Sequence, residues 1–209
     1  MIKNLLFDLG GVIMDIRRAD CIAAFKQLGM EHPEDFLGEY VQAGPFMGIE
    51  NGSMTPQQFR DTLRPYLRAD VTDGEIDTAF ERFLVGIPVS RLRALTRLRE
   101  AGYRVCLLSN TNPIMWDGKI SEEFRKDGAS GPEDYFDAMI RSYEVKVMKP
   151  AAEIFRIAAE RCGIVPEETI FLDDSQSNLN AAAREGYHTL LVAPGYEFET
   201  LLEEQLAKS

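Results

Sequence analysis

The sequence is poor in the residues that build disulfides and zinc sites. It has only three cysteines and two histidines among 209 residues. The cysteines Cys21, Cys106 and Cys162 are odd in number and far apart, which excludes a disulfide framework and disfavours a zinc site. We therefore expect them to be buried free thiols in a reducing cytoplasm.

Long apolar runs are also absent. No stretch approaches the roughly 18 consecutive apolar residues that a membrane-spanning helix needs. The first residues, a single lysine followed by a short apolar segment, lack the pattern of a secretory signal peptide. Together these absences predict a cytoplasmic protein without a membrane partner.

Positive charge is scarce. The 23 Lys and Arg residues are outnumbered by 34 Asp and Glu residues, the net charge is −11, and no basic cluster is present. Nucleic acid and anionic membranes attract proteins with basic surfaces, so neither is an expected partner. A phosphorylated small molecule stays compatible with this balance, because a local site can be positive inside a negative protein.

Short apolar segments alternate with helical patterns along most of the chain. The helices are predicted to begin near Pro88, Pro150 and Ser175, and each ends at a glycine. This alternation is typical of an α/β protein, with a Rossmann-like parallel sheet and helices on both of its faces. The predicted strands are 4–8, 104–109, 138–141, 169–173 and 189–192.

Residues 15–86 break this rhythm. They contain helix-start signals at Pro33, Thr55 and Thr72 and no convincing strand, which predicts an inserted all-helical cap. The predicted domains are therefore an α/β core of residues 1–14 and 87–209 and a cap of residues 15–86. A second irregular stretch, 116–135, is long for a loop in a compact domain.

Polar residues follow the apolar strands where each strand ends. Asp8 follows the first strand, Ser109 ends the second, and Asp173 and Asp174 follow the fourth, while Lys149 precedes a helix. Each of them alone is typical of a helix cap, a turn or a solvated side chain. In a parallel sheet, however, all of them would meet at one edge, where carboxylates could bind Mg²⁺ and a lysine could bind phosphate.

These segments resemble the four signature motifs of the haloacid dehalogenase superfamily. Their order agrees with that family, and the gap of 101 residues between Asp8 and Ser109 suits its inserted helical cap. The opening Asp-Leu-Gly-Gly-Val is similar to the phosphatase branch that includes bacterial α-D-glucose-1-phosphate phosphatases. The matching segments are Asp8-Leu9-Gly10-Gly11-Val12, Leu107-Leu108-Ser109-Asn110-Thr111, Lys149-Pro150 with Ile154-Phe155, and Phe171-Leu172-Asp173-Asp174-Ser175-Gln176-Ser177-Asn178.

The resemblance implies a role for each motif residue. Asp8 would be the nucleophile that becomes an aspartyl phosphate. Asp8, the carbonyl oxygen of Gly10, Asp173 and Asp174 would surround Mg²⁺, with Asp174 the better ligand of the last pair, and Asn178 would orient them.

The phosphoryl group has its own implied set of residues. Ser109, the backbone near Asn110, and Lys149 would hold it, so that catalysis rests on positioning and charge neutralisation.

Gly10 departs from the family pattern. Family phosphatases usually carry a second Asp there, which protonates the leaving oxygen and later activates water. General acid–base help of this kind is worth roughly 10²–10⁴-fold in rate. Three interpretations remain open: a leaving group that needs little protonation, a substitute group from the cap or from the turn that contains Asp15, or a site that binds with little turnover.

The sequence thus predicts a Mg²⁺-dependent phosphatase that acts on a small phosphate ester, such as a sugar 1-phosphate, through Asp8. The alternative is a catalytically weak metabolite-binding or regulatory protein, because Gly10 lacks the acid. The expected partner is a small phosphorylated metabolite, and the expected assembly is a monomer or homodimer.

Overall fold

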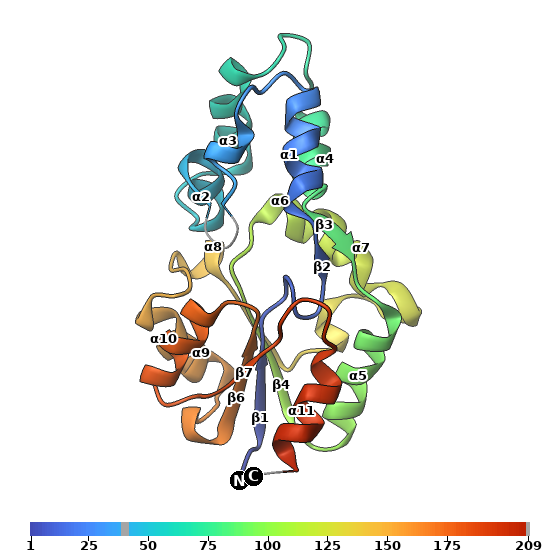
Figure 1. Ribbon diagram of the computed structural model, residues 1–209, viewed down its shortest axis with the longest axis vertical. Coiled ribbons are helices and arrows are strands. Elements are labelled where there is room, and N and C mark those ends of the chain that lie inside the picture. Colours follow the sequence, from blue (N-terminus) through green and yellow to red (C-terminus); the bar gives the residue numbers. More distant parts are fainter. Residues whose placement is uncertain (39–41, 208–209) are drawn as a thin grey trace.

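The computed structural model describes residues 1–38 and 42–207 of the chain. Its core is a five-stranded parallel sheet with strand order β5-β4-β1-β6-β7, so that β1 lies in the middle (Figure 1). The predicted α/β class is confirmed, and the strand bounds agree with the expected ones to within one residue. The strands are β1 (Asn4–Phe7), β4 (Arg104–Ser109), β5 (Ala138–Arg141), β6 (Thr169–Asp173) and β7 (His188–Leu191).

The central strands are apolar on both faces because helices cover both. In β1, Leu5 and Phe7 pack into one apolar cluster, whereas Leu6 packs into a second cluster on the opposite face. The first cluster is completed by α5 (Val89–Glu100) and α11 (Phe198–Leu206), the second by α9 (Ala152–Cys162) and α10 (Gln176–Arg184). Figure 1 shows these two helix pairs on opposite sides of the sheet.

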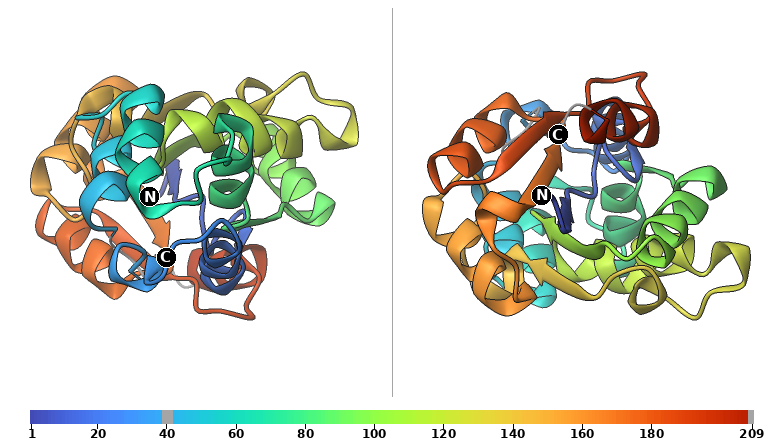
Figure 2. Two further views of the ribbon diagram at one scale, coloured as in Figure 1. Left: turned by 90° about the horizontal axis from the view of Figure 1, so that it is seen from above. Right: turned by 90° about the horizontal axis from the view of Figure 1, so that it is seen from below.

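Four helices form a separate layer above the carboxyl edge of the sheet, and we call this layer the cap. They are α1 (Arg18–Gln27), α2 (Gly44–Glu50), α3 (Pro56–Leu63) and α4 (Asp73–Glu81), and Figure 2 shows them from above, in front of the core. The side chains of Thr55 and Thr72 accept hydrogen bonds from the backbone of Gln58 and Glu75, so capping boxes start α3 and α4 at the predicted places.

The expectation that residues 15–86 contain no strand is wrong. The short strands β2 (Asp15–Ile16) and β3 (Leu84–Gly86) pair in an antiparallel ribbon where the chain enters and leaves the cap. Strands of two and three residues are too short to show a periodic pattern. Their pairing joins the two connections between cap and core.

The stretch 116–135, expected to be irregular, is largely helical turns. Ile120 and Phe124 are buried there, so tertiary packing stabilises segments that are too short to be stable helices alone. None of the described helices is long and apolar enough to cross a membrane. The turns of this stretch are η3 (Trp116–Ile120), α7 (Ser121–Phe124), η4 (Lys126–Gly128) and η5 (Pro132–Asp134). The other short helical segments are η1 (Pro33–Asp35), η2 (Arg64–Tyr66), α6 (Pro113–Met115), α8 (Ser142–Val145) and η6 (Pro166–Glu168).

Four phenylalanines hold the cap helices together, one from each helix. Phe46 of α2 lies edge-on to Phe25, Phe59 and Phe80, with ring centroids 5.2 Å apart in each pair. All four side chains are buried. Edge-to-face pairs of this kind add to the stability that burial itself provides.

We predict that Phe46→Ala destabilises the protein by about 3–5 kcal/mol, because it removes the ring that all three others contact. Urea denaturation followed by circular dichroism measures the free energy of unfolding. The matched control is Met47→Ala in the same helix, where the side chain is 40% exposed and the expected change is small. Equal losses in both variants would contradict the central role of Phe46.

Candidate active site

The predicted site residues converge at the carboxyl edge of the sheet. Asp8 directly follows β1, Ser109 ends β4 and Asp173 ends β6, while Lys149 lies in the loop between α8 and α9. All four side chains are buried. Since β1 lies between β4 and β6, Asp8 stands where the strand order changes direction, which is where open α/β sheets bind ligands.

The ammonium group of Lys149 binds two of the carboxylates. Its Nζ lies 2.7 Å from Asp8 Oδ1 and 2.7 Å from Asp173 Oδ2. Burial alone would lower the pKa of Lys149, but Asp173 and Asp8 outweigh it and raise that pKa. Lys149 is therefore a fixed positive charge beside Asp8.

The two adjacent aspartates at the end of β6, Asp173 and the following Asp174, have different surroundings. Both oxygens of Asp173 are engaged, because Oδ1 accepts hydrogen bonds from Ser175 N at 2.8 Å and Asn178 Nδ2 at 3.0 Å, and Oδ2 contacts Lys149. Asp174 instead lines the cavity next to Asp8. This arrangement favours Asp174 as the metal ligand and Asp173 as the group that positions Lys149.

A contact that the sequence did not predict holds the backbone of Lys149. The Asn110 side chain accepts a hydrogen bond from Lys149 N at 2.9 Å and donates one to Lys149 O at 3.0 Å. Asn110 also follows Ser109 directly, so the loop that carries Lys149 is tied to the end of β4.

Gly10 and Gly11, which follow Asp8 closely, differ in whether their surroundings would accept a side chain. A Cβ at Gly11 would lie 2.3 Å from Asp174 Oδ2, and its φ is +76°, so only glycine fits. A Cβ at Gly10 would meet only Ile16 at 3.5 Å, an ordinary contact. Close contacts at the Cβ position therefore do not explain why this residue is a glycine.

A cavity of about 100 Å³ opens in front of Asp8 between the core and the cap. A second cavity of about 60 Å³ adjoins it and reaches Ser109 and Asn110. The residues around the first cavity are Asp8, Gly10, Ile16, Gln42, Glu50, Phe83, Asn110, Lys149, Asp174, Ser175 and Asn178.

Two cap residues at this cavity were missed by the motif analysis. Gln42 and Glu50 line both cavities, and both are buried. The sequence did contain a signal for Glu50, because it is a carboxylate at the end of the otherwise apolar helix α2. Burying an acid costs free energy, so a buried acid suggests a function. Phe46 and Ile49 of the same helix are core residues instead.

Asp15, the first residue of β2 and the next carboxylate after Asp8 in the sequence, does not line this cavity. Its Oδ1 accepts a hydrogen bond from Arg91 Nη1 at 2.7 Å, and Arg91 also binds the carbonyl oxygen of Ile13 and the carboxylate of Glu197. Asp15 thus has a structural partner where the chain leaves the core.

The charges at Asp8 fit a divalent cation. The pKa of Asp8 is raised to about 7, mainly by burial; Lys149 opposes this shift, and Asp173 and Asp174 contribute to it. Ligand oxygens of Asp8, Asp173 and Asp174 lie within 4.8 Å of one another. Three carboxylates and one ammonium give a formal charge of −3 + 1 = −2, which Mg²⁺ would neutralise, favouring the ionised form of Asp8.

The family model for haloacid dehalogenase-like hydrolases matches residues 2–186. The chain belongs to this family. It is 36% identical to a D-ribitol-5-phosphate phosphatase from Bacteroides thetaiotaomicron, over 90% of this chain and 91% of that protein. It is 29% identical to a glyceraldehyde 3-phosphate phosphatase from Pyrococcus abyssi, over 91% of this chain and 81% of that protein.

Solved structures of haloacid dehalogenase-like enzymes have the same fold as this chain. A family enzyme from Bacteroides thetaiotaomicron, in complex with magnesium and inorganic phosphate, has a TM-score of 0.88 and 40% identity. The match covers 96% of this chain and 99% of that chain. The predicted hydrolase with phosphatase relatives is thereby confirmed, while the roles of individual site residues stay predictions.

We expect saturating Mg²⁺ to stabilise the protein, because it offsets the repulsion among the three carboxylates. At 100 times Kd, the gain is about 2.7 kcal/mol, or roughly 5–10 °C in Tm. Thermal unfolding in MgCl₂ and in chelator measures it. Asp174→Asn should lose most of the shift, whereas Asp117→Asn, an exposed residue, should keep it. An undiminished shift in Asp174→Asn would exclude Asp174 as a ligand.

Proposed function

We propose that this protein is a Mg²⁺-dependent phosphatase of small phosphorylated metabolites that forms an aspartyl phosphate on Asp8. The observation that carries the proposal is the position of Asp8. It lies at the switch point of the sheet, 2.7 Å from a buried ammonium group, and faces a small cavity that Asp174 also lines. A nucleophile, a fixed cation and a place for a divalent metal are thereby side by side.

The chain's own residues account for the first chemical step. Asp8 attacks phosphorus in line with the ester oxygen, while Lys149 and the groups around Ser109 and Asn110 neutralise and orient the phosphoryl oxygens. Mg²⁺ held by Asp8, the Gly10 carbonyl oxygen and the Asp173-Asp174 pair, of which Asp174 faces the cavity, would supply the remaining positive charge.

The cavity supports a small polar substrate. The cavities of about 100 and 60 Å³ leave room for a short organic group between the cap and the core. Gln42 Oε1 is buried there without a hydrogen-bond partner among the described residues, and a substrate hydroxyl would satisfy it. We therefore infer a polyol or sugar phosphate, a class that includes the sugar 1-phosphates and the substrate of the ribitol-5-phosphate phosphatase relative.

We also infer a cytoplasmic location. Cys21, Cys106 and Cys162 are free and buried, as is usual in a reducing compartment. Neither nucleic acid nor a membrane is a proposed partner, and a monomer or homodimer stays the predicted assembly.

We expect the wild-type protein to release inorganic phosphate from at least one ester of a panel of polyol phosphates, sugar phosphates and 4-nitrophenyl phosphate. The reaction should need Mg²⁺, and Asp8→Asn should reduce it by on the order of 10⁴–10⁶-fold, because the nucleophile is lost. Phosphate release measures both effects.

Asp15→Asn is the matched control for this panel, because Asp15 pairs with Arg91 away from the cavity. It should keep the wild-type rate. If no ester turns over faster with the wild type than with Asp8→Asn, the phosphatase proposal fails, and the alternative of a site that binds with little turnover is favoured.

A further inference from the structure

The proposed phosphatase needs a proton donor that Gly10 does not provide. When an ester of an ordinary alcohol is cleaved, the departing oxygen must take up a proton, and Asp8 is occupied as the nucleophile. Lys149 is engaged by Asp8 and Asp173, and Asp15 lies outside the cavity. The remaining acid at the cavity comes from the cap.

Glu50 is that acid, and the core holds it in place. It is the last residue of α2, and its carbonyl oxygen accepts a hydrogen bond of 2.7 Å from Ser142 Oγ in α8. Two residues later the chain passes so close to the core that a Cβ at Gly52 would lie 2.2 Å from the carbonyl oxygen of Tyr143. These contacts fix the end of α2 against the edge of the sheet.

The side chain of Glu50 lies between the two halves of the site. It is only 9% exposed and lines both cavities together with Gly10 and Asn110. Within the described parts of the chain, no hydrogen bond or ion pair reaches its carboxyl group. Burial raises the pKa of Glu50 to about 8, so the group carries a proton at neutral pH.

The charged groups around Glu50 do not favour the loss of its proton. The core contributes Asp8, Lys149 and Asp174 to the shared cavity, where the carboxylates and the ammonium oppose each other. The helices packed against α2 are α1, α3, α4 and α8, and most of their charged groups have partners of their own. In α3 and α8, Arg60 pairs with Asp77, Asp61 is bound by Gln57, Glu144 pairs with Arg141, and Tyr143 is the remaining titratable group. In α1 and α4, Asp20 pairs with Arg17, Lys26 with Glu34 and Asp73 with Arg64, Arg18 donates to Leu37 O, Glu75 accepts from Thr72, Glu81 accepts from Lys119 N, and Cys21 is a buried thiol.

We propose that Glu50 is a catalytic residue, which donates its proton to the leaving oxygen of the ester and replaces the acid that Gly10 lacks. This inference rests on the phosphatase function proposed above. It assigns the missing role to the cap, so that the acid and the nucleophile approach the substrate from opposite sides of the cavity.

The proposed reaction has two steps. An oxygen of Asp8 bonds to phosphorus, the bond from phosphorus to the ester oxygen breaks, and that oxygen takes the proton of Glu50 and leaves as the alcohol. In the second step the Glu50 carboxylate takes a proton from water, whose oxygen bonds to phosphorus. The bond from phosphorus to Asp8 then breaks, and inorganic phosphate, the Asp8 carboxylate and protonated Glu50 result.

The test compares two leaving groups in the full-length protein with Mg²⁺. Glu50→Gln keeps the shape of the side chain but cannot donate a proton. With the fastest primary-alcohol phosphate of the panel, we expect kcat to fall by roughly 10²–10⁴-fold. With 4-nitrophenyl phosphate, whose leaving group needs no proton, the formation of the aspartyl phosphate in a single turnover should change less than about tenfold.

The pH profile gives a second readout. Because protonated Glu50 is the active form, wild-type kcat/KM for the primary-alcohol ester should decline as pH rises through about 8. Glu50→Gln should lack this decline. Glu31→Gln, which alters an exposed cap carboxylate, should match the wild type in both readouts.

The Gly10 position offers a rescue. Because a Cβ there meets only Ile16 at 3.5 Å, Gly10→Asp can be combined with Glu50→Gln and should restore much of the lost rate on the primary-alcohol ester.

The outcomes separate the two proposals. If the wild type cleaves neither ester above the Asp8→Asn background, the phosphatase function itself fails. If the wild type cleaves only 4-nitrophenyl phosphate, or if Glu50→Gln slows both esters equally or neither, Glu50 is not the proton donor although phosphatase activity itself stands.

Discussion

One buried ammonium group holds the site together. Lys149 Nζ joins Asp8 and Asp173, and its side chain is 1% exposed. Without it, three carboxylates would face one another where water screens charge poorly, and an unpaired charge there is strongly destabilising. The three segments that meet at Lys149 are distant in the sequence. The clamp by Asn110 and the hydrogen bonds to Asp173 are best understood as supports for this cation.

Much of the core could be predicted because it follows from local rules. Apolar strands between helices specify a parallel sheet, and a parallel sheet brings Asp8, Ser109 and Asp173 to one edge whatever the details of packing. Glu50 and Gln42 could not be found in this way. Their place depends on how the cap lies on the core, which Ser142 and Tyr143 determine through contacts that leave no periodic signal. Strands β2 and β3 were missed because they are so short.

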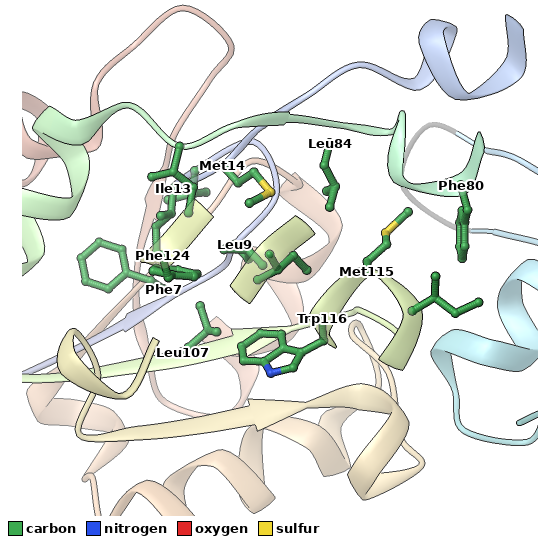
Figure 3. Packing of buried hydrophobic residues seen from close by; sticks show 14 of the residues in the cluster. Phe7, Leu9, Ile13, Met14, Phe80, Leu84, Leu107, Met115, Trp116 and Phe124 are labelled. Carbon is green, nitrogen blue, oxygen red and sulfur yellow. The ribbon is translucent and has the colours of Figure 1, made fainter. Parts of the chain in front are cut away.

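The cap and the core share one apolar cluster rather than two separate ones. Residues of β1, such as Phe7, and of the cap, such as Phe46, belong to the same set. In Figure 3, Leu84 and Met115 lie between Phe80 of the cap and Leu9 of the core. Phe80, Leu84 and Met115 also line the smaller cavity, so the packing that joins the two layers shapes the space for the organic part of a substrate.

The tight passage at Gly52 has a consequence for how this sequence can change over time. Its φ of +69° and the 2.2 Å approach to Tyr143 both exclude a side chain. Any other residue would clash with the carbonyl oxygen of Tyr143 and displace the end of α2, so that the cap could not keep its position on the core. A single substitution two residues from the proposed proton donor would then open the cavity between the cap and the core more widely to solvent. Substitution of Gly52 would therefore remove the proposed catalysis while the phosphate-binding residues of the core stay in place.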